Sequence, residues 1–167
     1  MSDRTRTLRR TIESGSIKMV QSYKHLDVLI VDDEPFMRKT LSQMLKILGI
    51  SVVREAGNGT QALQELISLP ESERPNLLIC DISMDRMGGI ELLERLRGHQ
   101  DFDLAGMPVI VATAHSDRET VRRAVDRYIS GYLVKPFKTP QLKARIDQCL
   151  ADLPARESLS GRGSRIA

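Results

Sequence analysis

The feature that most constrains the fold is an alternation of two kinds of segment between Leu26 and Leu153. Short apolar runs rich in Val and Ile alternate with stretches whose apolar residues recur with the period of an α-helix. Strands that are buried on both faces and separated by helices are typical of a parallel sheet covered by helices on both sides. The pattern therefore predicts an α/β fold with a doubly wound, five-stranded parallel sheet. The strands are expected at Asp27 to Val31, Val52 to Ala56, Asn76 to Cys80, Pro108 to Ala112 and Gly131 to Val134.

Local signals mark one end of four of the five helices that follow these strands. The first helix is expected to end at Gly49, because glycine readily adopts the left-handed conformation that closes a helix. The second begins near Asn58, the fourth near the capping-box spacing at Ser116, and the fifth at Pro140. The helical residues expected to be buried are Phe36, Thr40, Leu41, Met44, Leu45, Leu48, Ala62, Leu63, Leu66, Ile67, Ile90, Leu93, Leu96, Val121, Ala124, Val125, Leu142, Ile146, Cys149 and Leu150.

The excess positive charge of the chain lies at its two ends. The 167 residues carry a formal net charge of +3. Residues 1–25 hold six basic and two acidic side chains, residues 154–167 hold three and one, and the middle is therefore net negative. Because both ends are poor in large apolar residues, we predict a flexible basic arm over 1–25 and a flexible tail over 154–167, on either side of one domain over 26–153. A solvated arm is favoured over one that binds nucleic acid.

The sequence contains no segment typical of a membrane span or a secretory signal. Its apolar runs fall far short of the roughly 20 residues needed to cross a bilayer, and no long apolar region follows the basic residues near Met1. We therefore predict a cytoplasmic protein that does not insert into membranes. Cys80 and Cys149 lie far apart outside any metal or redox motif, and we expect both to be reduced core thiols.

Polar residues follow four of the five predicted strands. Asp32 and Asp33 follow the first strand, Asp81 the third, Thr113 the fourth and Lys135 the fifth. In an open parallel sheet, the functional crevice lies beyond the carboxyl ends of the strands, so these side chains should meet there. Each residue alone has an ordinary structural explanation as a turn, cap or surface residue. Together, the carboxylates would repel one another unless a cation neutralised them, and an oxygen-lined site suits Mg²⁺.

This combination resembles the receiver domain of two-component response regulators, which implies a flavodoxin-like (βα)5 fold. The resemblance covers Leu26 to about Leu153. It is carried by Val28-Leu29-Ile30-Val31-Asp32-Asp33-Glu34, by Leu78-Ile79-Cys80-Asp81 with Met84 and Gly89 following, by Val111-Ala112-Thr113-Ala114, and by Gly131-Tyr132-Leu133-Val134-Lys135-Pro136-Phe137. It implies a signalling switch that catalyses only its own phosphorylation and dephosphorylation, rather than an enzyme with a separate substrate.

The resemblance also implies a role for each matching residue. The phosphoryl site would consist of the phosphoacceptor Asp81 with Lys135, Thr113 and the backbone amide of Ala114. Mg²⁺ would be held by Asp32, Asp33, Asp81 and the backbone carbonyl of Ser83. The conformational switch would consist of Thr113, Tyr132, which moves inward, and Pro136, whose cis peptide bond holds Lys135 in place.

The implied partners are proteins. The phosphoryl donor would be a sensor histidine kinase or a phosphotransfer protein. An unknown output protein would bind the face made by the fourth helix, the fifth strand and the fifth helix, where Arg118, Arg122, Arg123 and Arg127 supply positive charge. Because residues 154–167 show no apolar periodicity, we expect a single-domain receiver of the chemotaxis type, monomeric or weakly dimeric.

Several positions depart from the family pattern. Asp85 stands where the family usually has proline, Gly88 where it usually has aspartate, and Tyr128 where a glycine normally ends the fourth helix. Ser83 and His115 occupy the two variable positions that flank the phosphoryl site. These departures predict a looser loop after Asp81 and a different end to the fourth helix.

Three alternatives follow from the same residues. The chain could be the truncated receiver of a DNA-binding regulator, although Gly131 and Gln141 replace acidic residues of that class's dimer face. It could be a degenerate receiver that binds partners without phosphorylation, for which Asp85 and Gly88 are the support. A phosphohydrolase of the haloacid-dehalogenase type would need an aspartate two residues after Asp81, where Ser83 stands.

Overall fold

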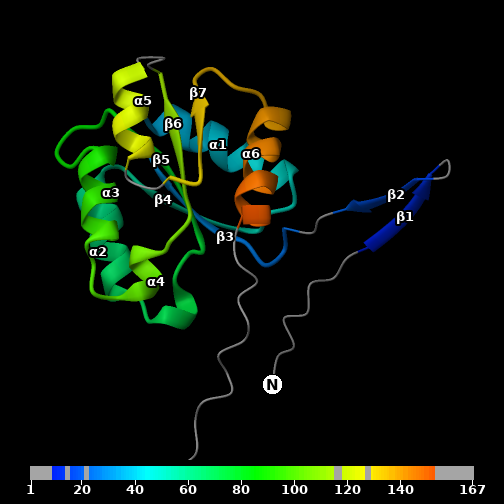
Figure 1. Cartoon of the computed structure of the whole chain (residues 1–167), viewed down its shortest axis with the longest axis horizontal. Helices are drawn as coiled ribbons and strands as arrows, with labels where there is room; N and C mark the ends of the chain where they lie inside the picture. Colours follow the sequence, from blue (N-terminus) through cyan, green and yellow to red (C-terminus); the bar gives the residue numbers. More distant parts are fainter. Residues whose placement is uncertain (1–8, 14–15, 21–22, 115–117, 127–128, 153–167) are drawn as a thin grey trace, which may run out of the picture.

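The computed structural model describes residues 9–13, 16–20, 23–114, 118–126 and 129–152 (Figure 1). Its centre is a five-stranded parallel sheet with the strand order β4-β3-β5-β6-β7. The strands are β3 (Asp27–Val31), β4 (Val52–Ala56), β5 (Leu77–Asp81), β6 (Val109–Thr113) and β7 (Gly131–Val134). The predicted α/β sheet is confirmed. β5 and β6 begin one residue later than expected, so that Asp81 and Thr113 are the last residues of paired strands.

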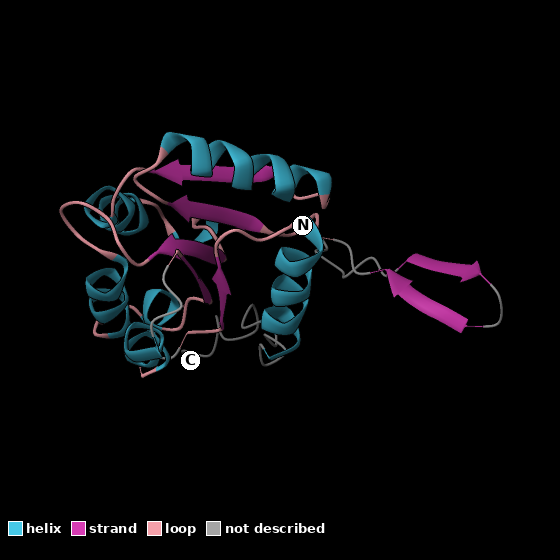
Figure 2. Ribbon diagram, turned by 90° about the horizontal axis from the view of Figure 1, so that it is seen from above, coloured by secondary structure: helices cyan, strands magenta, loops and turns pink. Residues whose placement is uncertain are grey.

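Helices cover both faces of the sheet (Figures 1 and 2). Alternate residues of β3 pack against the helices on opposite faces. Val28 and Ile30 belong to a core cluster with helices α1 (Pro35–Ile47) and α6 (Thr139–Asp152). Leu29 and Val31 belong to a second cluster on the opposite face. That cluster includes residues of α2 (Gly59–Ser68), α3 (Gly89–Arg97), the short α4 (Phe102–Ala105) and α5 (Arg118–Val125). Because successive strand residues point to opposite faces, the uninterrupted apolar run of β3 is buried on both sides.

The helix ends follow the local signals in the sequence. Gly49 has a φ of +89° directly after α1, and the side chain of Asn58 caps α2 by accepting a hydrogen bond from the Gln61 amide. Pro140 lies in the first turn of α6. The predicted start of the fourth helix at Ser116 lies outside the described residues. The sequence did not predict α4 or the 3₁₀ turn η1 (Glu71–Glu73).

Three helical residues predicted to be buried are exposed instead. Phe36, Ile67 and Val125 are 76%, 49% and 52% exposed. Ile67 directly follows the buried Leu66 in α2, and Val125 directly follows the buried Ala124 in α5. One helical step of about 100° turns each of these exposed residues away from the sheet. Phe36 lies five residues before the buried Leu41, which also places it off the buried stripe. The side chain of Val121 lies outside the described part of the chain.

The N-terminal segment contains two elements that the sequence did not predict. β1 (Arg9–Glu13) and β2 (Ser16–Val20) pair antiparallel in a sheet of their own, to one side of the main domain (Figures 1 and 2). Tyr23 is buried in the α1 and α6 core cluster, and its hydroxyl donates a hydrogen bond to Asp147. The core cluster therefore includes Tyr23, a residue that the sequence places in the N-terminal arm. The predicted tail over 154–167 lies outside the described residues.

Both cysteines are buried and neither forms a disulfide. Burial raises the pKa of the Cys80 and Cys149 thiols, which keeps them in the unreactive thiol form. In the described ranges, every helix is too short or too polar to cross a membrane.

Candidate functional site

The candidate site lies at the carboxyl ends of the central strands. The chain passes from β3 to β4 on one side and returns to β5 on the other, so the crevice beyond β3 and β5 is a topological switch point. Asp32 directly follows β3 and Asp81 ends β5. Lys135 directly follows β7. The fold therefore brings together charged residues from strands that are far apart in the sequence.

Three carboxylates form an oxygen-lined cluster in this crevice. One carboxylate oxygen from each of Asp32, Asp33 and Asp81 lies within 4.8 Å of the others. Asp32 and Asp81 are 1% and 7% exposed, whereas Asp33 is half-buried. Hard carboxylate oxygens of this kind are the ligands that Mg²⁺ prefers. The residues present therefore fit a magnesium site.

Lys135 bridges two of these carboxylates. Its Nζ lies 2.7 Å from Asp32 Oδ2 and 3.2 Å from Asp81 Oδ2. Burial alone would lower the pKa of Lys135, but the hydrogen bond to Asp32 and the charge of Asp81 outweigh it and raise that pKa. The pKa of Asp81 is raised because burial and repulsion by Asp32 outweigh the attraction of Lys135. One ammonium group does not neutralise the negative charge of three carboxylates, which favours the binding of an additional cation.

Asp32 is held by hydrogen bonds at each of its polar groups. Its amide donates to Ala56 O at 3.2 Å, and its Oδ1 accepts from the Glu34 amide at 2.9 Å. Its carbonyl oxygen accepts from Arg38 Nη1 at 2.7 Å, and Oδ2 faces Lys135. Both carboxylate oxygens of Asp32 therefore accept hydrogen bonds, one from the loop backbone and one from Lys135.

The loop after Asp81 is shaped by close backbone contacts. The amide of Ser83 lies 3.3 Å from Asp81 Oδ1, and the exposed Asp85 contributes its amide to Asp33 Oδ2 at 3.4 Å. A Cβ atom on Gly89 would lie 2.2 Å from the carbonyl oxygen of Asp81, a distance that no side chain tolerates. Glycine is therefore required where α3 begins beneath the candidate site.

The remaining predicted site residues lie at the same edge of the sheet or beside it. Thr113 is fully buried at the end of β6, and its carbonyl oxygen accepts the Lys135 amide at 2.7 Å. Ala114 follows it and is exposed, and the Lys135–Pro136 peptide bond is cis. Tyr132 is 40% exposed, with its ring centre 5.8 Å from Cζ of Arg145 on α6. The aromatic side chain is thus exposed beside α6. His115, Arg127 and Tyr128 fall outside the described residues.

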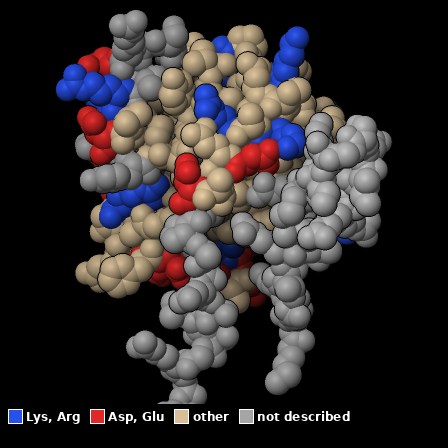
Figure 3. Space-filling model, turned by 45° about the vertical axis from the view of Figure 1, so that its right-hand side comes forward, with Lys and Arg blue, Asp and Glu red and all other residues tan. Residues whose placement is uncertain are grey.

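Sequence reasoning missed one residue of the site. Arg38 contacts the backbone of the acidic loop, and its Nε also lies 3.3 Å from Glu55 Oε2 on β4. Its position one turn into the helix after Asp32 and Asp33 was the available signal, because a long side chain there can reach back to the loop. On the molecular face drawn in Figure 3, basic and acidic side chains intermingle, without one large patch of either charge.

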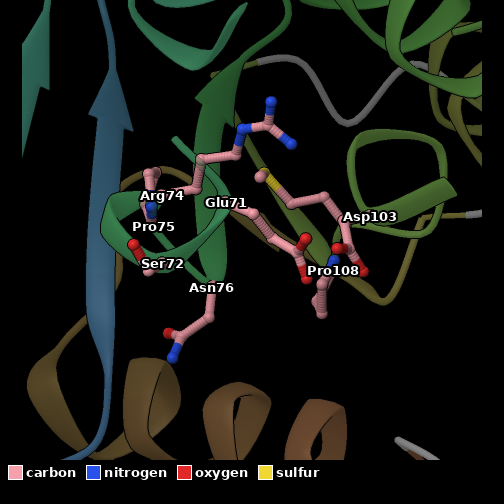
Figure 4. A pocket seen from close by; sticks show the side chains of 8 residues that line it. Glu71, Ser72, Arg74, Pro75, Asn76, Asp103 and Pro108 are labelled. Carbon is pink, nitrogen blue, oxygen red and sulfur yellow. The ribbon is translucent and has the colours of Figure 1, made fainter. Parts of the chain in front are cut away.

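A surface cavity of about 410 Å³ lies at the other end of the sheet (Figure 4). It is lined by Glu71, Ser72, Arg74, Pro75, Asn76, Asp103, Met107 and Pro108. Asn76 and Pro108 immediately precede β5 and β6, so the cavity lies at the amino ends of these strands. It is therefore separate from the acidic crevice.

Comparison with known proteins agrees with this geometry. Residues 28–147 match the family described as the response regulator receiver domain. The transcriptional regulatory protein PdtaR of Mycobacterium tuberculosis is 35% identical over 140 residues, which cover 84% of this chain and 64% of PdtaR, so the chain spans slightly less than two thirds of that relative. The chemotaxis protein CheY-3 of Vibrio cholerae serotype O1 is 34% identical over 125 residues, 75% of this chain and 92% of CheY-3.

Among solved structures, the signal receiver domain of a signal transduction histidine kinase from Syntrophus aciditrophicus superposes with a TM-score of 0.68. It is 29% identical in sequence, and the match covers 83% of this chain and 99% of that domain. The sheet order, the acidic crevice and these similarities lead to one conclusion. The chain belongs to the response regulator receiver domain family.

Proposed function

We propose that this chain accepts a phosphoryl group on Asp81 from a phosphohistidine of a sensor histidine kinase or phosphotransfer protein, in a Mg²⁺-dependent reaction. The observation that carries the proposal is the position of Asp81 between Lys135 and the acid pair, at the carboxyl end of the central strand β5. The reaction is proposed to take place in the cytoplasm, with the chain acting as a switch rather than as an enzyme with its own substrate.

The side chains support an in-line transfer. A carboxylate oxygen of Asp81 attacks phosphorus, the phosphorus–nitrogen bond breaks with its electron pair going to the imidazole, and an acyl phosphate forms. The Lys135 ammonium, 3.2 Å from Asp81 Oδ2, neutralises charge that develops on the phosphoryl oxygens. The Thr113 hydroxyl and the Ala114 amide, at the adjacent strand end, are proposed to bind phosphoryl oxygens after transfer.

The metal ligands in this proposal are the carboxylates of Asp32, Asp33 and Asp81 with the backbone carbonyl of Ser83. Mg²⁺, when bound, offsets the negative charge of the carboxylates and of the incoming phosphoryl group. Asp32 orients Lys135 through the 2.7 Å ion pair, so the acid pair serves both the metal and the ammonium group.

The proposal is tested by intact-mass measurement after incubation with a small phosphodonor such as acetyl phosphate. We expect a gain of one phosphoryl group in Mg²⁺, mapped by fragment masses to the peptide that contains Asp81, and no gain in excess chelator. Equal labelling in chelator would contradict the metal requirement. A chain that takes no phosphoryl group from a donor or a kinase would be a degenerate receiver instead.

The output of the switch is proposed to lie on the face formed by α5, β7 and α6. Thr113 and Lys135 connect the phosphoryl site to β7, which carries the exposed side chains of Tyr132 and Val134. Arg122 and Arg123 are exposed on α5, where positive charge would steer association with an acidic partner surface. Thr113, Tyr132 and Pro136 are the proposed switch residues, and the chain is proposed to act as a monomer or weak dimer.

Phosphorylation is expected to change amide hydrogen exchange on this face. The backbone of residues 129–135 should change protection, because Lys135 and Thr113 would form new contacts with the phosphoryl group. The internal control is α2, which packs on β3 and β4, toward the opposite edge of the sheet from β7. Exchange that changes equally in α2 and β7, or in neither, would contradict this assignment of the output face.

A further inference from the structure

The acidic loop is tied to the edge strand β4 by one side chain. Arg38 Nη1 donates to the carbonyl oxygen of Asp32 at 2.7 Å, and Arg38 Nε donates to Glu55 Oε2 at 3.3 Å. The Arg38 side chain is 20% exposed and that of Glu55 is 42% exposed. The guanidinium therefore bridges the loop between β3 and α1 and a carboxylate on the neighbouring strand.

This bridge acts on the backbone from which Asp33 projects. The carbonyl of Asp32 and the amide of Asp33 belong to the same planar peptide unit, so a hydrogen bond to that carbonyl fixes the orientation of the unit. Within the described residues, the Asp33 carboxylate accepts one hydrogen bond, at 3.4 Å from the Asp85 amide. Backbone geometry, rather than its own contacts, therefore sets where the Asp33 carboxylate lies.

We propose that Arg38 is a positioning residue for the metal site: it holds the Asp32–Asp33 peptide so that the Asp33 carboxylate faces Asp81, and Glu55 holds Arg38 in place. The inference rests on the proposed function, because it concerns the same Mg²⁺ site. Partners of metal ligands that do not touch the metal commonly affect metal affinity strongly, because they limit the orientations of the ligands.

Charge and positioning predict opposite effects for the loss of Arg38. Removing a positive charge beside three carboxylates would strengthen Mg²⁺ binding, whereas releasing the Asp33 backbone would weaken it. The double variant Arg38→Met with Glu55→Gln removes one charge of each sign and leaves the net charge unchanged. It therefore isolates the effect of the hydrogen bond to Asp32.

The experiment is a Mg²⁺ titration of the full chain, followed through amide chemical shifts. The double variant should bind Mg²⁺ roughly tenfold more weakly than the wild type, at the lower end of the effects seen for such partners. Glu55→Gln alone should weaken binding less, because Arg38 keeps its bond to Asp32. Arg38→Lys keeps the positive charge and can still donate to the Asp32 carbonyl, so it should bind Mg²⁺ nearly as tightly as the wild type.

Arg54 offers a matched control. It also pairs with a carboxylate and a carbonyl, at 3.0 Å from Asp27 Oδ2 and 2.8 Å from Glu73 O, but away from the acidic crevice. Arg54→Met combined with Asp27→Asn, which also leaves the net charge unchanged, should lose stability in urea without a change in Mg²⁺ affinity. A general loosening of the fold would instead weaken Mg²⁺ binding in both variants and would overturn the assignment to Arg38.

The outcomes separate this inference from the proposed function. Unchanged affinity in the double variant, with normal binding in the wild type, overturns the positioning role and leaves the proposed function standing. Absence of saturable Mg²⁺ binding in the wild type overturns both. A second measurement needs no metal: the amides of Asp33 and Glu34 should exchange faster in the double variant than in the wild type, and equal exchange overturns the role of Arg38.

Discussion

Replacing Asp81 with asparagine is expected to abolish phosphoryl labelling altogether. The amide is nearly the same shape as the carboxylate but lacks the anionic oxygen that attacks phosphorus. Intact mass after incubation with acetyl phosphate and Mg²⁺ measures the effect. Asp126→Asn, which changes an exposed carboxylate on the chain segment after α5, is the control and should label as the wild type does. Labelling that persists in Asp81→Asn would place the phosphoacceptor elsewhere.

The same variant should fold normally. Because the pKa of Asp81 is raised in the folded chain, its contribution to the free energy of unfolding falls as pH rises from its unfolded pKa of about 3.9 through the higher folded value. Above that window the ionised carboxylate destabilises the fold, and asparagine removes this penalty. We therefore expect Asp81→Asn to unfold in urea at the wild-type midpoint or above it at neutral pH, so that lost labelling reflects lost chemistry.

Replacing Lys135 with methionine is expected to destabilise the metal-free chain by about 3 kcal/mol, the low end of the cost of breaking a buried ion pair. The side chains of Lys135, Asp32 and Asp81 are 10%, 2% and 8% exposed, so the variant leaves two buried carboxylates without their ammonium partner. Urea unfolding in chelator measures the loss. Added Mg²⁺ should restore more stability to the variant than it adds to the wild type, because the cation compensates the same carboxylates.

Lys143 provides the contrast for this experiment. It pairs with Asp147 at 2.6 Å, but the two side chains are 50% and 31% exposed. Exposed pairs contribute at most about 1 kcal/mol, so Lys143→Met should have a small effect that Mg²⁺ does not reverse. Equal losses of stability in the two variants would show that the Lys135 ion pairs stabilise the fold no more than an exposed pair does.

The sheet could be predicted from the sequence because its signals are local and strong. Uninterrupted apolar runs such as Val28 to Val31 require burial on both faces, and β3, β4 and β7 have the predicted limits. The acidic crevice could also be predicted, because a parallel sheet brings its strand ends together whatever the loops do. Asp32, Asp33, Asp81 and Lys135 meet as that rule requires.

Features that depend on helix rotation and on long side chains could not be predicted in the same way. Phe36 has the apolar character of a core residue, and only the direction of α1 shows that it is exposed. Apart from its position after the acid pair, nothing in the sequence distinguishes Arg38 from other polar helix residues. Its contact with the Asp32 carbonyl depends on the fold of the loop and could not be predicted. The composition of residues 1–25 places Tyr23 in the arm, because a contact with Asp147, 124 residues later in the chain, leaves no local signal.

The contact between Lys135 and Asp32 has a consequence for the synthesis of the protein. The two residues are 103 positions apart, and they directly follow the last and the first strands of the main sheet to leave the ribosome. A nascent chain that ends before β7 holds the complete acid pair and Asp81 but lacks the ammonium group that compensates them. Under the proposed function, competence for phosphorylation would therefore arise late in translation, when the final strand joins the sheet.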